Sequence, residues 1–236
     1  MRAWLAIAAL WATPAAAVTC EDLTFEDHSL TACTVDAGED LRLFHSDAAG
    51  DVLGGFSAVE GHAGGTLAFA MNAGMYHDNR APVGLYRENG VETQRLITSD
   101  GPGNFGLLPN GVFCFGNGRA RVIESLAFQA AAPTCPHATQ SGPMLVIDGA
   151  LHPRLIPDGT SKFTRNGVGT PADGSGAVFL ISNDPINFHT FARVFRDVLG
   201  LPNALYFDGK VSRLYAPQLG RADFGFQLGP IVGVVE

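Results

Sequence analysis

The stretch A-V-F-L-I-S-N-D-P-I-N-F-H-T-F-A-R-V-F-R-D-V-L-G-L-P-N-A-L-Y-F-D-G, residues 177–209, decides the expected fold. Ala177–Ser182 near its start and Ala204–Phe207 near its end are short apolar runs, which indicates two buried strands. Between them apolar residues recur at helical spacing, so a helix is expected to connect the strands. A strand, a helix and a second strand of one sheet predict a right-handed βαβ unit with parallel strands.

The helix of this unit is predicted from signals at both ends and from one apolar stripe. Asn187 is a favourable N-cap, and Gly200 followed by Pro202 stops the helix. The stripe expected to pack on the sheet consists of Phe188, Phe191, Ala192, Phe195, Val198 and Leu199. Elsewhere we expect a short helix around Glu124–Ala130.

The rest of the chain has the pattern of a strand-rich protein. Glycine contributes 29 residues, and the apolar runs are short and bounded by Gly, Pro, Asn or Asp. Further strands are expected at 41–45, 67–71, 83–87, 92–97, 105–108, 112–115, 144–147, 151–155 and 227–235. Asn-Gly or Asp-Gly at 89–90, 110–111 and 148–149 predicts a hairpin turn at each place. The expected fold class is α+β: a single domain with a mixed, strand-rich sheet, the helix of the βαβ unit and few other helices.

The first seventeen residues predict a secretory signal. Met1-Arg2 is a short basic start, Ala3–Ala12 is a nearly continuous apolar run, and Ala15–Ala17 supplies the small residues of a cleavage site. The run is shorter than the about 20 apolar residues that span a bilayer, and no later run approaches that length. We therefore expect a signal peptide at 1–17, a domain at 18–236, a periplasmic or secreted location and no stable membrane insertion. The alternative is a retained N-terminal helix.

The cysteines and the charge narrow the class of protein further. Cys20, Cys33, Cys114 and Cys135 would enter an oxidising compartment, which favours two disulfides. Three pairings are possible, and the short spacings favour Cys20–Cys33 and Cys114–Cys135 over a zinc site. A formal net charge of −8 without a basic cluster argues against nucleic-acid binding. It leaves room for an anionic small molecule in a local cationic pocket.

Polar residues lie at the ends of several expected strands, where loops on a rigid scaffold collect binding residues. The candidates of this kind are Asn72, Gly74, Ser141, Gly142, Arg165 and Gly169. Arg165 is flanked by glycines, which suits a phosphate or carboxylate, although a lone arginine is also a common surface charge. Asn72 could equally cap the end of a strand.

Two carboxylates follow the strands of the βαβ unit. Because parallel strands end at the same edge of a sheet, Asp184 and Asp208 are expected to open on one crevice. Two acids in one cleft can divide the roles of acid and base. The competing interpretation is structural, since Asp184-Pro185 can initiate a turn and Asp208-Gly209 can form one.

Other motifs are weaker. The histidines show no metal-ligand spacing, and the G-x-S-x-G signature is absent. G-P-G-N-F-G at 101–106 does not lead into a helix, so it predicts a turn or lid and no dinucleotide site. We expect neither a cofactor nor a bound metal.

Five motifs occur in order: N-A-G-M-Y at 72–76, G-P-G-N-F at 101–105, Q-S-G-P-M-L-V-I-D-G at 140–149, R-N-G-V-G at 165–169 and F-D-G at 207–209. Together they resemble the phosphodiester glycosidase family, and in particular its compact bacterial secreted branch. The resemblance covers residues 40–236. The family often continues D-G-G-G-S where this chain has D-G-K-V-S at 208–212, so its loop of backbone amides must differ here.

The resemblance implies hydrolysis of a sugar linked through its anomeric oxygen to a phosphodiester. It implies a binding pocket with Lys210 as an extra positive charge. The other residues of this pocket would be Asn72, Gly74, Ser141, Gly142, Arg165, Gly169, Asp208 and Gly209. Arg165 would stabilise the departing phosphate, and Asp208 would act as nucleophile or base, with Asp184 as a partner. The alternatives are a non-catalytic envelope protein that binds anionic glycans, and a phosphodiesterase that breaks the phosphorus–oxygen bond. The expected partner is a small-molecule or glycan substrate bearing a phosphodiester.

Overall fold

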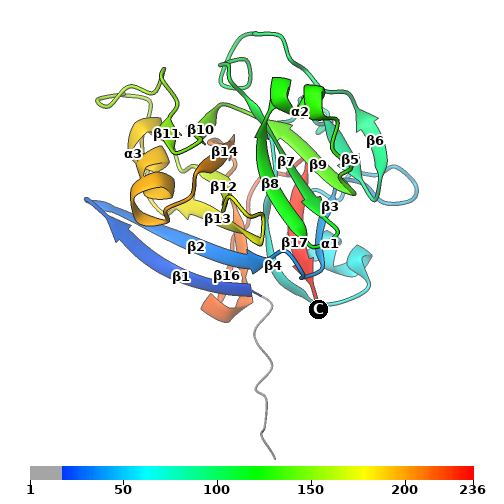
Figure 1. Ribbon diagram of the computed structural model, residues 1–236. Coiled ribbons are helices and arrows are strands. Elements are labelled where there is room, and N and C mark those ends of the chain that lie inside the picture. The colour runs from blue at the N-terminus through cyan, green and yellow to red at the C-terminus, as the bar shows by residue number, and fades with distance from the viewer. Residues whose placement is uncertain (1–17) are drawn as a thin grey trace, which may run out of the picture.

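The computed structural model describes residues 18–236, in which the strands form three sheets and the helices are few (Figure 1). This architecture confirms the predicted single strand-rich α+β domain. The predicted signal peptide at 1–17 lies outside the described residues. No helix in residues 18–236 is long and apolar enough to cross a membrane.

The seven-stranded sheet contains both strands of the segment 177–209. In order across the sheet the strands are β1 (Val18–Phe25), β2 (His28–Asp36), β13 (Gly176–Ser182), β12 (Asn166–Thr170), β14 (Asn203–Asp208), β10 (Met144–Ile147) and β11 (Ala150–Leu151). β12 is antiparallel to both β13 and β14, so these two strands run parallel with one strand between them. Within residues 18–236 the strand pairings are antiparallel in each of the three sheets. The expected mixed sheet would also contain hydrogen-bonded parallel pairs.

The connecting helix starts where the sequence predicts and then changes type. Asn187 caps α3 (Phe188–Arg193), accepting a hydrogen bond from the Thr190 amide at 2.8 Å. The chain continues as a π-helical turn, Val194–Val198, with an i to i+5 bond from the Leu199 amide to the Val194 carbonyl. A π-turn holds more residues than an α-turn and rotates the positions that follow it. Val194 is therefore buried, and Val198, predicted to be on the apolar stripe, is 47% exposed.

The other two sheets have five strands each. One has the order β16 (Arg221–Ala222), β15 (Leu214–Ala216), β4 (Leu67–Asn72), β17 (Ile231–Val235) and β3 (Leu41–Phe44). The other has the order β6 (Val91–Gln94), β5 (Tyr86–Glu88), β9 (His137–Ser141), β7 (Gly111–Gly116) and β8 (Arg119–Glu124). The remaining helices are α1 (Phe56–Ala63), α2 (Ser125–Ala131), which matches the short helix expected there, and a 3-10 turn at Pro217–Leu219.

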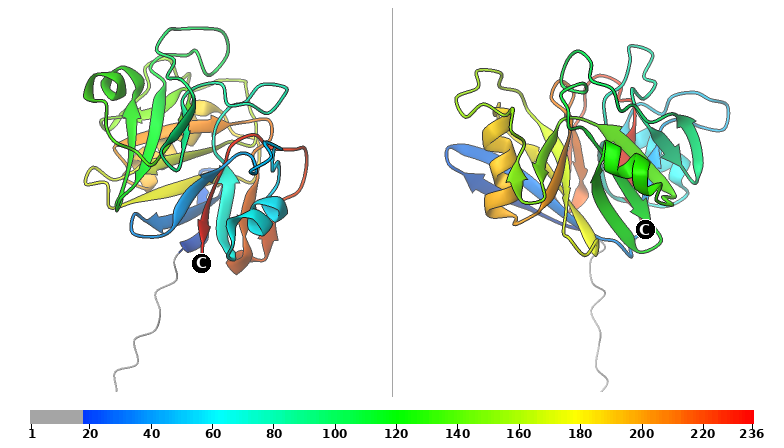
Figure 2. Two further views of the ribbon diagram at one scale, coloured as in Figure 1. Left: turned by 90° about the vertical axis from the view of Figure 1, so that its right-hand side faces the viewer. Right: turned by 45° about the horizontal axis from the view of Figure 1, so that its top comes forward.

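The three sheets pack around one core, and Figure 2 shows their arrangement from two further sides. Aromatic rings lie where the sheets meet. Phe69 of β4 lies 4.8 Å from Phe179 of β13, measured between ring centroids. Phe113 of β7 lies 5.7 Å from the same Phe179 ring and 6.3 Å from Phe207 of β14. All three sheets thus contribute to a single buried cluster, the seven-stranded sheet through both β13 and β14, and this cluster joins the sheets into one domain.

Two of the three predicted hairpins are confirmed. Asn89-Gly90 joins β5 to β6, and Asp148-Gly149 joins β10 to β11. The predicted hairpin at Asn110-Gly111 is wrong: 105–108 is not a strand, and Asn110 is buried. β7 instead turns into β8 at Asn117-Gly118, where both residues have positive φ. Asn-Gly occurs at both places, and only the pairing partner of β7 decides which one turns.

Several strands have no clear sequence signal, and β12 is the central case. Its sequence N-G-V-G-T contains two glycines, which are poor strand formers. Close packing explains them: a Cβ at Gly167 would lie 2.5 Å from the Leu205 carbonyl oxygen, and one at Gly169 would lie 2.7 Å from a Leu201 methyl. The first of these contacts is with the neighbouring strand β14 and the second with the segment that follows the helix.

Both favoured disulfides are confirmed. Cys20 and Cys33 face each other across the hairpin of β1 and β2, and Cys114 of β7 is bonded to Cys135. The strands β1 and β2, which the first disulfide joins, were not predicted.

Candidate functional site

Asp208 ends β14 and lies on the wall of a cavity of about 190 Å³. The residues that line this Asp208 cavity are Met75, Asn104, Phe163, Tyr206, Asp208, Gly209 and Lys210. The Asp208 Oδ1 accepts hydrogen bonds from the amides of Gly209 and Lys210, the latter at 3.0 Å. Burial raises the pKa of Asp208 above its ordinary value, and those two amides and the Lys210 charge offset part of the rise.

A pair of fully buried asparagines holds Asp208 in place. The Asn166 Oδ1 accepts from the Asp208 amide at 3.1 Å and from the Asn72 Nδ2, also at 3.1 Å. The Asn166 Nδ2 in turn donates to the Asn72 carbonyl at 2.8 Å. Asn72 therefore ties β4 to the seven-stranded sheet behind Asp208 and does not line the cavity. Asn166, which the sequence analysis did not single out, is the direct support of Asp208.

Arg165 is fully buried immediately behind the cavity. Its Nε donates to the Ile186 carbonyl at 2.9 Å, and its Nη2 donates to the Ser161 carbonyl at 2.9 Å. Its guanidinium carbon lies 3.6 Å from the centre of the Phe188 ring. These partners are neutral, so the positive charge is held in the interior by carbonyl oxygens and an aromatic face. Burial lowers the pKa of Arg165.

Arg165 and Asp208 converge at the Asp208 cavity through Tyr206 and Gly209. The Arg165 Nη1 donates to the Tyr206 hydroxyl at 3.3 Å. A Cβ on Gly209 would lie 2.2 Å from that hydroxyl and 3.4 Å from the Arg165 Nη1, so only glycine fits between them. The guanidinium thus contacts the cavity wall from behind, while Tyr206, Gly209 and Asp208 face the cavity.

Ser141, Gly142, Gly74 and Gly169 do not line the Asp208 cavity. The Ser141 hydroxyl is buried and donates to the Phe207 carbonyl at 3.0 Å, which joins β9 to β14. The three glycines permit close packing: a Cβ on Gly142 would lie 2.7 Å from the Asn110 Cβ, and one on Gly74 would lie 3.0 Å from the Thr139 hydroxyl. These residues shape the scaffold around β14.

Asp184 and Asp208 do not share a cavity. Asp184 follows β13, and its carboxylate accepts from the Ser29 amide at 2.9 Å and contacts the His28 ring at the end of the β1–β2 hairpin. β12 separates β13 from β14, so the two strand ends are about 10 Å apart across the sheet. Burial alone would raise the pKa of Asp184, but the His28 and Ser29 hydrogen bonds outweigh it and lower the pKa.

Two cavity residues were missed although the sequence carries a signal for each. Tyr206 lies two positions before Asp208, and alternate residues of a strand share a face. Asn104 belongs to the glycine-rich segment 101–106, which was predicted to be a turn or lid and which reaches the cavity here. Phe163 and Met75 come from segments whose approach to β14 depends on the tertiary fold.

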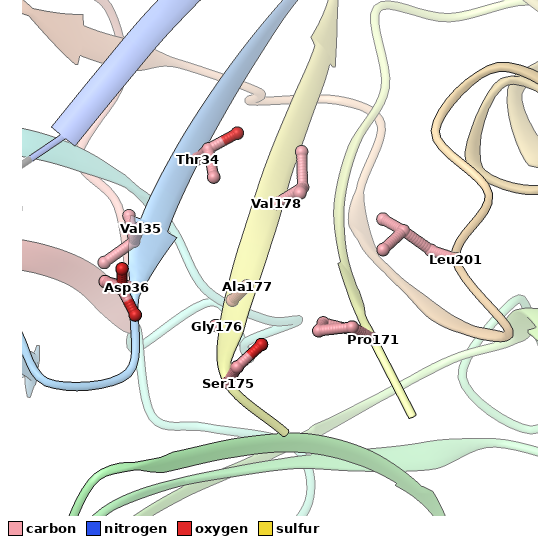
Figure 3. A pocket seen from close by; sticks show the side chains of 9 residues that line it. All are labelled: Thr34, Val35, Asp36, Pro171, Ser175, Gly176, Ala177, Val178 and Leu201. Carbon is pink, nitrogen blue, oxygen red and sulfur yellow. The ribbon is translucent and has the colours of Figure 1, made fainter. Parts of the chain in front are cut away.

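A second cavity lies beside the first residues of β13, and its lining differs in polarity and charge from that of the Asp208 cavity (Figure 3). Its volume is about 180 Å³. It is lined by Thr34, Val35, Asp36, Pro171, Ser175, Gly176, Ala177, Val178 and Leu201. That lining is mainly apolar, contains a carboxylate and includes no lysine or arginine. It therefore offers no cationic side chain to a phosphate, whereas the Asp208 cavity has Lys210 in its wall.

One family model and one curated relative match this chain over most of its length. The family model of phosphodiester glycosidases matches residues 65–223. The chain is 36% identical over 212 residues to the protein of Escherichia coli K12 named "Uncharacterized protein YigE", covering 88% of this chain and 83% of that protein.

Two solved structures share the fold. The catalytic domain of zebrafish N-acetylglucosamine-1-phosphodiester alpha-N-acetylglucosaminidase, auto-inhibited by its pro-peptide, has a TM-score of 0.57 at 10% identity, over 93% of this chain and 82% of that one. A putative exported protein of Burkholderia pseudomallei has a TM-score of 0.59 at 11% identity, over 89% of this chain and 74% of that one. With the family model matching more than half of its length, this chain belongs to the phosphodiester glycosidase family.

Proposed function

We propose that this protein hydrolyses the glycosidic bond of a sugar-1-phosphodiester in the Asp208 cavity. One observation carries the proposal: a half-buried carboxylate and a buried guanidinium meet at Gly209, on the wall of one cavity. A cleaved sugar phosphodiester needs both charges, because positive charge develops on the sugar ring and negative charge on the departing phosphate. Membership of the phosphodiester glycosidase family supports this choice of substrate class.

In the proposed mechanism Asp208 acts as nucleophile or as the base for water. A phosphate is a good leaving group and needs little proton transfer, so one carboxylate in the cavity can suffice. Asp184 points to the β1–β2 hairpin and has no role in this mechanism. The backbone amides of Gly209 and Lys210 fix the Asp208 carboxylate, and Asn166 fixes its main chain.

Arg165 acts on the phosphate through Tyr206. Because the Tyr206 oxygen accepts from Arg165, its own hydrogen is free to donate toward the cavity. The nearby positive charge strengthens that donor, and Lys210 supplies a direct charge on the wall. In this mechanism Asp208 acts on the sugar side, and Tyr206, Arg165 and Lys210 act on the phosphate side.

The cavity beside this one offers a place for the alcohol carried by the phosphate. It shares Asn104 with the Asp208 cavity and has a volume of about 170 Å³. Leu107, Leu155, Ile156 and Phe188 give it apolar walls, and Arg154 stands among them. We place the leaving phosphate ester across Asn104, with its alcohol in this neighbouring cavity.

The test is hydrolysis of a panel of sugar-1-phosphodiesters by the purified protein in oxygen-18 water. The proposal expects the label in the released sugar. Label in the phosphate would instead establish cleavage of the phosphorus–oxygen bond. Tight binding by calorimetry with no product after hours would establish a non-catalytic protein that binds anionic glycans.

We also propose a periplasmic or secreted location. Both disulfides fit an oxidising compartment. Fractionation of the native host with peptide mass spectrometry under non-reducing conditions tests this, and a cytoplasmic protein with four free thiols would contradict it.

A further inference from the structure

Another cavity lies beside the first turn of α1 and has one arginine and two carboxylates in its lining. Its volume is about 330 Å³, and it shares no lining residue with the Asp208 cavity. It is lined by Gly55, Phe56, Ser57, Ala58, Glu60, Arg213, Tyr215, Ala222, Asp223 and Phe224. We call it the Arg213 cavity. The packing of Phe56 against Tyr215, with ring centroids 5.9 Å apart, joins α1 to the sheet that contains β15 and β16.

Arg213 is a buried cation whose hydrogen bonds are incomplete. The side chain is 8% exposed, and within residues 18–236 its Nε has no hydrogen-bond partner. Its Nη2 donates to the Gly54 carbonyl at 3.3 Å, and its guanidinium carbon lies 5.5 Å from the centre of the Phe56 ring. A buried donor without an acceptor is costly, so such a group in a cavity wall indicates an absent acceptor.

The start of α1 supplies further unused donors to the same cavity. The N-cap is Gly55, and no side chain caps the helix. The amides of the first turn, at Phe56, Ser57 and Ala58, have no acceptor within the helix itself. The partial positive charge of a helix N-terminus adds to the charge of Arg213. Amides and a guanidinium directed at one space are the usual elements of a phosphate site.

The two carboxylates in this lining are occupied by other partners. Glu60 accepts from the Leu67 amide at 3.3 Å. Asp223 accepts from the Leu214 amide at 3.0 Å and forms an ion pair with Arg221 at 2.8 Å. Within residues 18–236 neither carboxylate forms a hydrogen bond or ion pair with Arg213. Burial lowers the pKa of Arg213, and the nearby charges of Tyr76 and Asp223 offset only part of that effect, so the guanidinium can still gain from an anionic ligand.

We propose that the Arg213 cavity is a second anion site that binds the phosphate group of a phosphomonoester between Arg213 and the first turn of α1. Phe56, Tyr215 and Phe224 provide apolar surface for the ring or chain that carries the phosphate. The site is distinct from the proposed catalytic site, although both rest on one support: the Arg213 amide donates to the Asn72 Oδ1 at 2.9 Å, and Asn72 pairs with Asn166 beneath Asp208. Because the two cavities share no lining residue, the inference does not depend on the protein being a hydrolase.

The experiment is calorimetric titration of the folded protein with inorganic phosphate and, in parallel, with a hexose phosphomonoester. Arg213→Met is expected to weaken phosphate binding at least tenfold because it removes the one cation that residues 18–236 contribute to the cavity lining. Arg119→Met is the matched control, since Arg119 is exposed on the hairpin of β7 and β8, and it should leave binding unchanged.

A second variant avoids the risk that Arg213→Met disturbs the fold. Ser57 is exposed in the first turn of α1, where an acidic side chain stabilises a helix. Ser57→Asp should therefore fold at least as well as the wild type and still lose phosphate binding at least tenfold, because its carboxylate repels the anion. Ser99→Asp, at an exposed loop position, is its control.

Asp208→Asn separates this proposal from the proposed function. Phosphate binding should be retained in Asp208→Asn even if turnover is lost. The proposal is overturned if the wild type binds neither probe, if Arg213→Met and Ser57→Asp bind as the wild type does, or if Asp208→Asn abolishes binding to the same extent. Loss in both cavity variants with retention in Asp208→Asn supports it.

Discussion

At the scale of the residue, Asp208 serves both as a turn residue and as a cavity residue. Its side chain accepts the amides of Gly209 and Lys210, as an Asp-Gly turn requires. The same carboxylate lies on the wall of a cavity, where burial raises its pKa. The turn bonds hold the carboxylate still, and the burial makes it a stronger base than an ordinary aspartate, so the structural role supports the chemical one.

Asp208→Asn is expected to lower turnover of a sugar phosphodiester about 100-fold or more, the usual contribution of a positioned base. Asn keeps an oxygen that accepts the two turn amides, so the fold should be retained. Steady-state kinetics measures the loss, and a circular dichroism spectrum matching the wild type is the control. Undiminished turnover would remove Asp208 from the mechanism.

The raised pKa of Asp208 predicts the direction in which pH changes both turnover and stability. Since the base must be ionised, turnover should fall on the acid side at a pH above the ordinary value of 3.8. A carboxyl group with a raised pKa in the folded state binds more protons there than when unfolded, so it contributes stability at low pH that is lost as pH rises through that pKa. At pH 7, Asp208→Asn should thus have a free energy of unfolding at least equal to that of the wild type. A less stable variant in urea would contradict this.

Tyr206→Phe should slow hydrolysis of phosphate-bearing substrates while leaving a neutral aryl glycoside less affected. The change removes the hydroxyl that links Arg165 to the cavity and keeps the ring that packs on Phe188, 4.6 Å away between centroids. A loss of about tenfold or more in kcat/KM, specific to the phosphodiester, is expected for one charge-assisted hydrogen bond. Equal losses on both substrates would contradict the role assigned to Arg165 and Tyr206.

At the scale of the element, the segment from Asn187 to Leu199 links the fold to the site. Its first residues carry Phe188, which stacks on Arg165, and the carbonyl of Ile186 just before it accepts from the same arginine. The π-turn at Val194–Val198 then buries Val194 and exposes Val198. The start of the helix, which the cap fixes, is therefore the part that matters to the cavity wall.

Asn187→Ala should lower the free energy of unfolding by about 1 kcal/mol, the usual value of an N-cap. The substitution removes the bond to the Thr190 amide and a second bond from the Asn187 Nδ2 to the Pro157 carbonyl. Urea unfolding measures the change. Gln129→Ala, at an exposed position of α2, is the matched control and should change the value little.

At the scale of the whole molecule, three sheets depend on one cluster of rings. Phe113 lies on β7 and contacts rings from β13 and β14, so it connects two sheets. Phe69 adds the third sheet through the same Phe179 ring. A substitution that opens a cavity in this cluster should therefore destabilise all three sheets together.

Phe113→Ala is expected to lower the free energy of unfolding by about 3–5 kcal/mol, because it opens a cavity at a fully buried site. Phe226→Ala makes the same chemical change at a residue that is 81% exposed and should cost little. Thermal unfolding of both variants provides the comparison. Equal shifts in Tm would show that the ring cluster does not hold the sheets together.

Sequence by itself determined the local features of this protein. The strand–helix–strand segment, the Asn187 cap, the two hairpins at Asn89-Gly90 and Asp148-Gly149, and both disulfide pairs follow from short-range signals. The position of Asp208 at the end of a strand also follows from such signals. Each depends on residues near one another in the chain, whose propensities and turn chemistry act before any long-range contact forms.

Only the tertiary structure decided which of these features meet. It inserted β12 between β13 and β14, which separated Asp184 from Asp208, and it brought Arg165 behind Gly209. It also paired Asn72 with Asn166 and turned Arg213 toward the start of α1. The physical reason is that strand pairing and burial depend on partners far apart in sequence, so that glycine-rich N-G-V-G-T becomes a central strand because β14 and the helix leave no room for side chains.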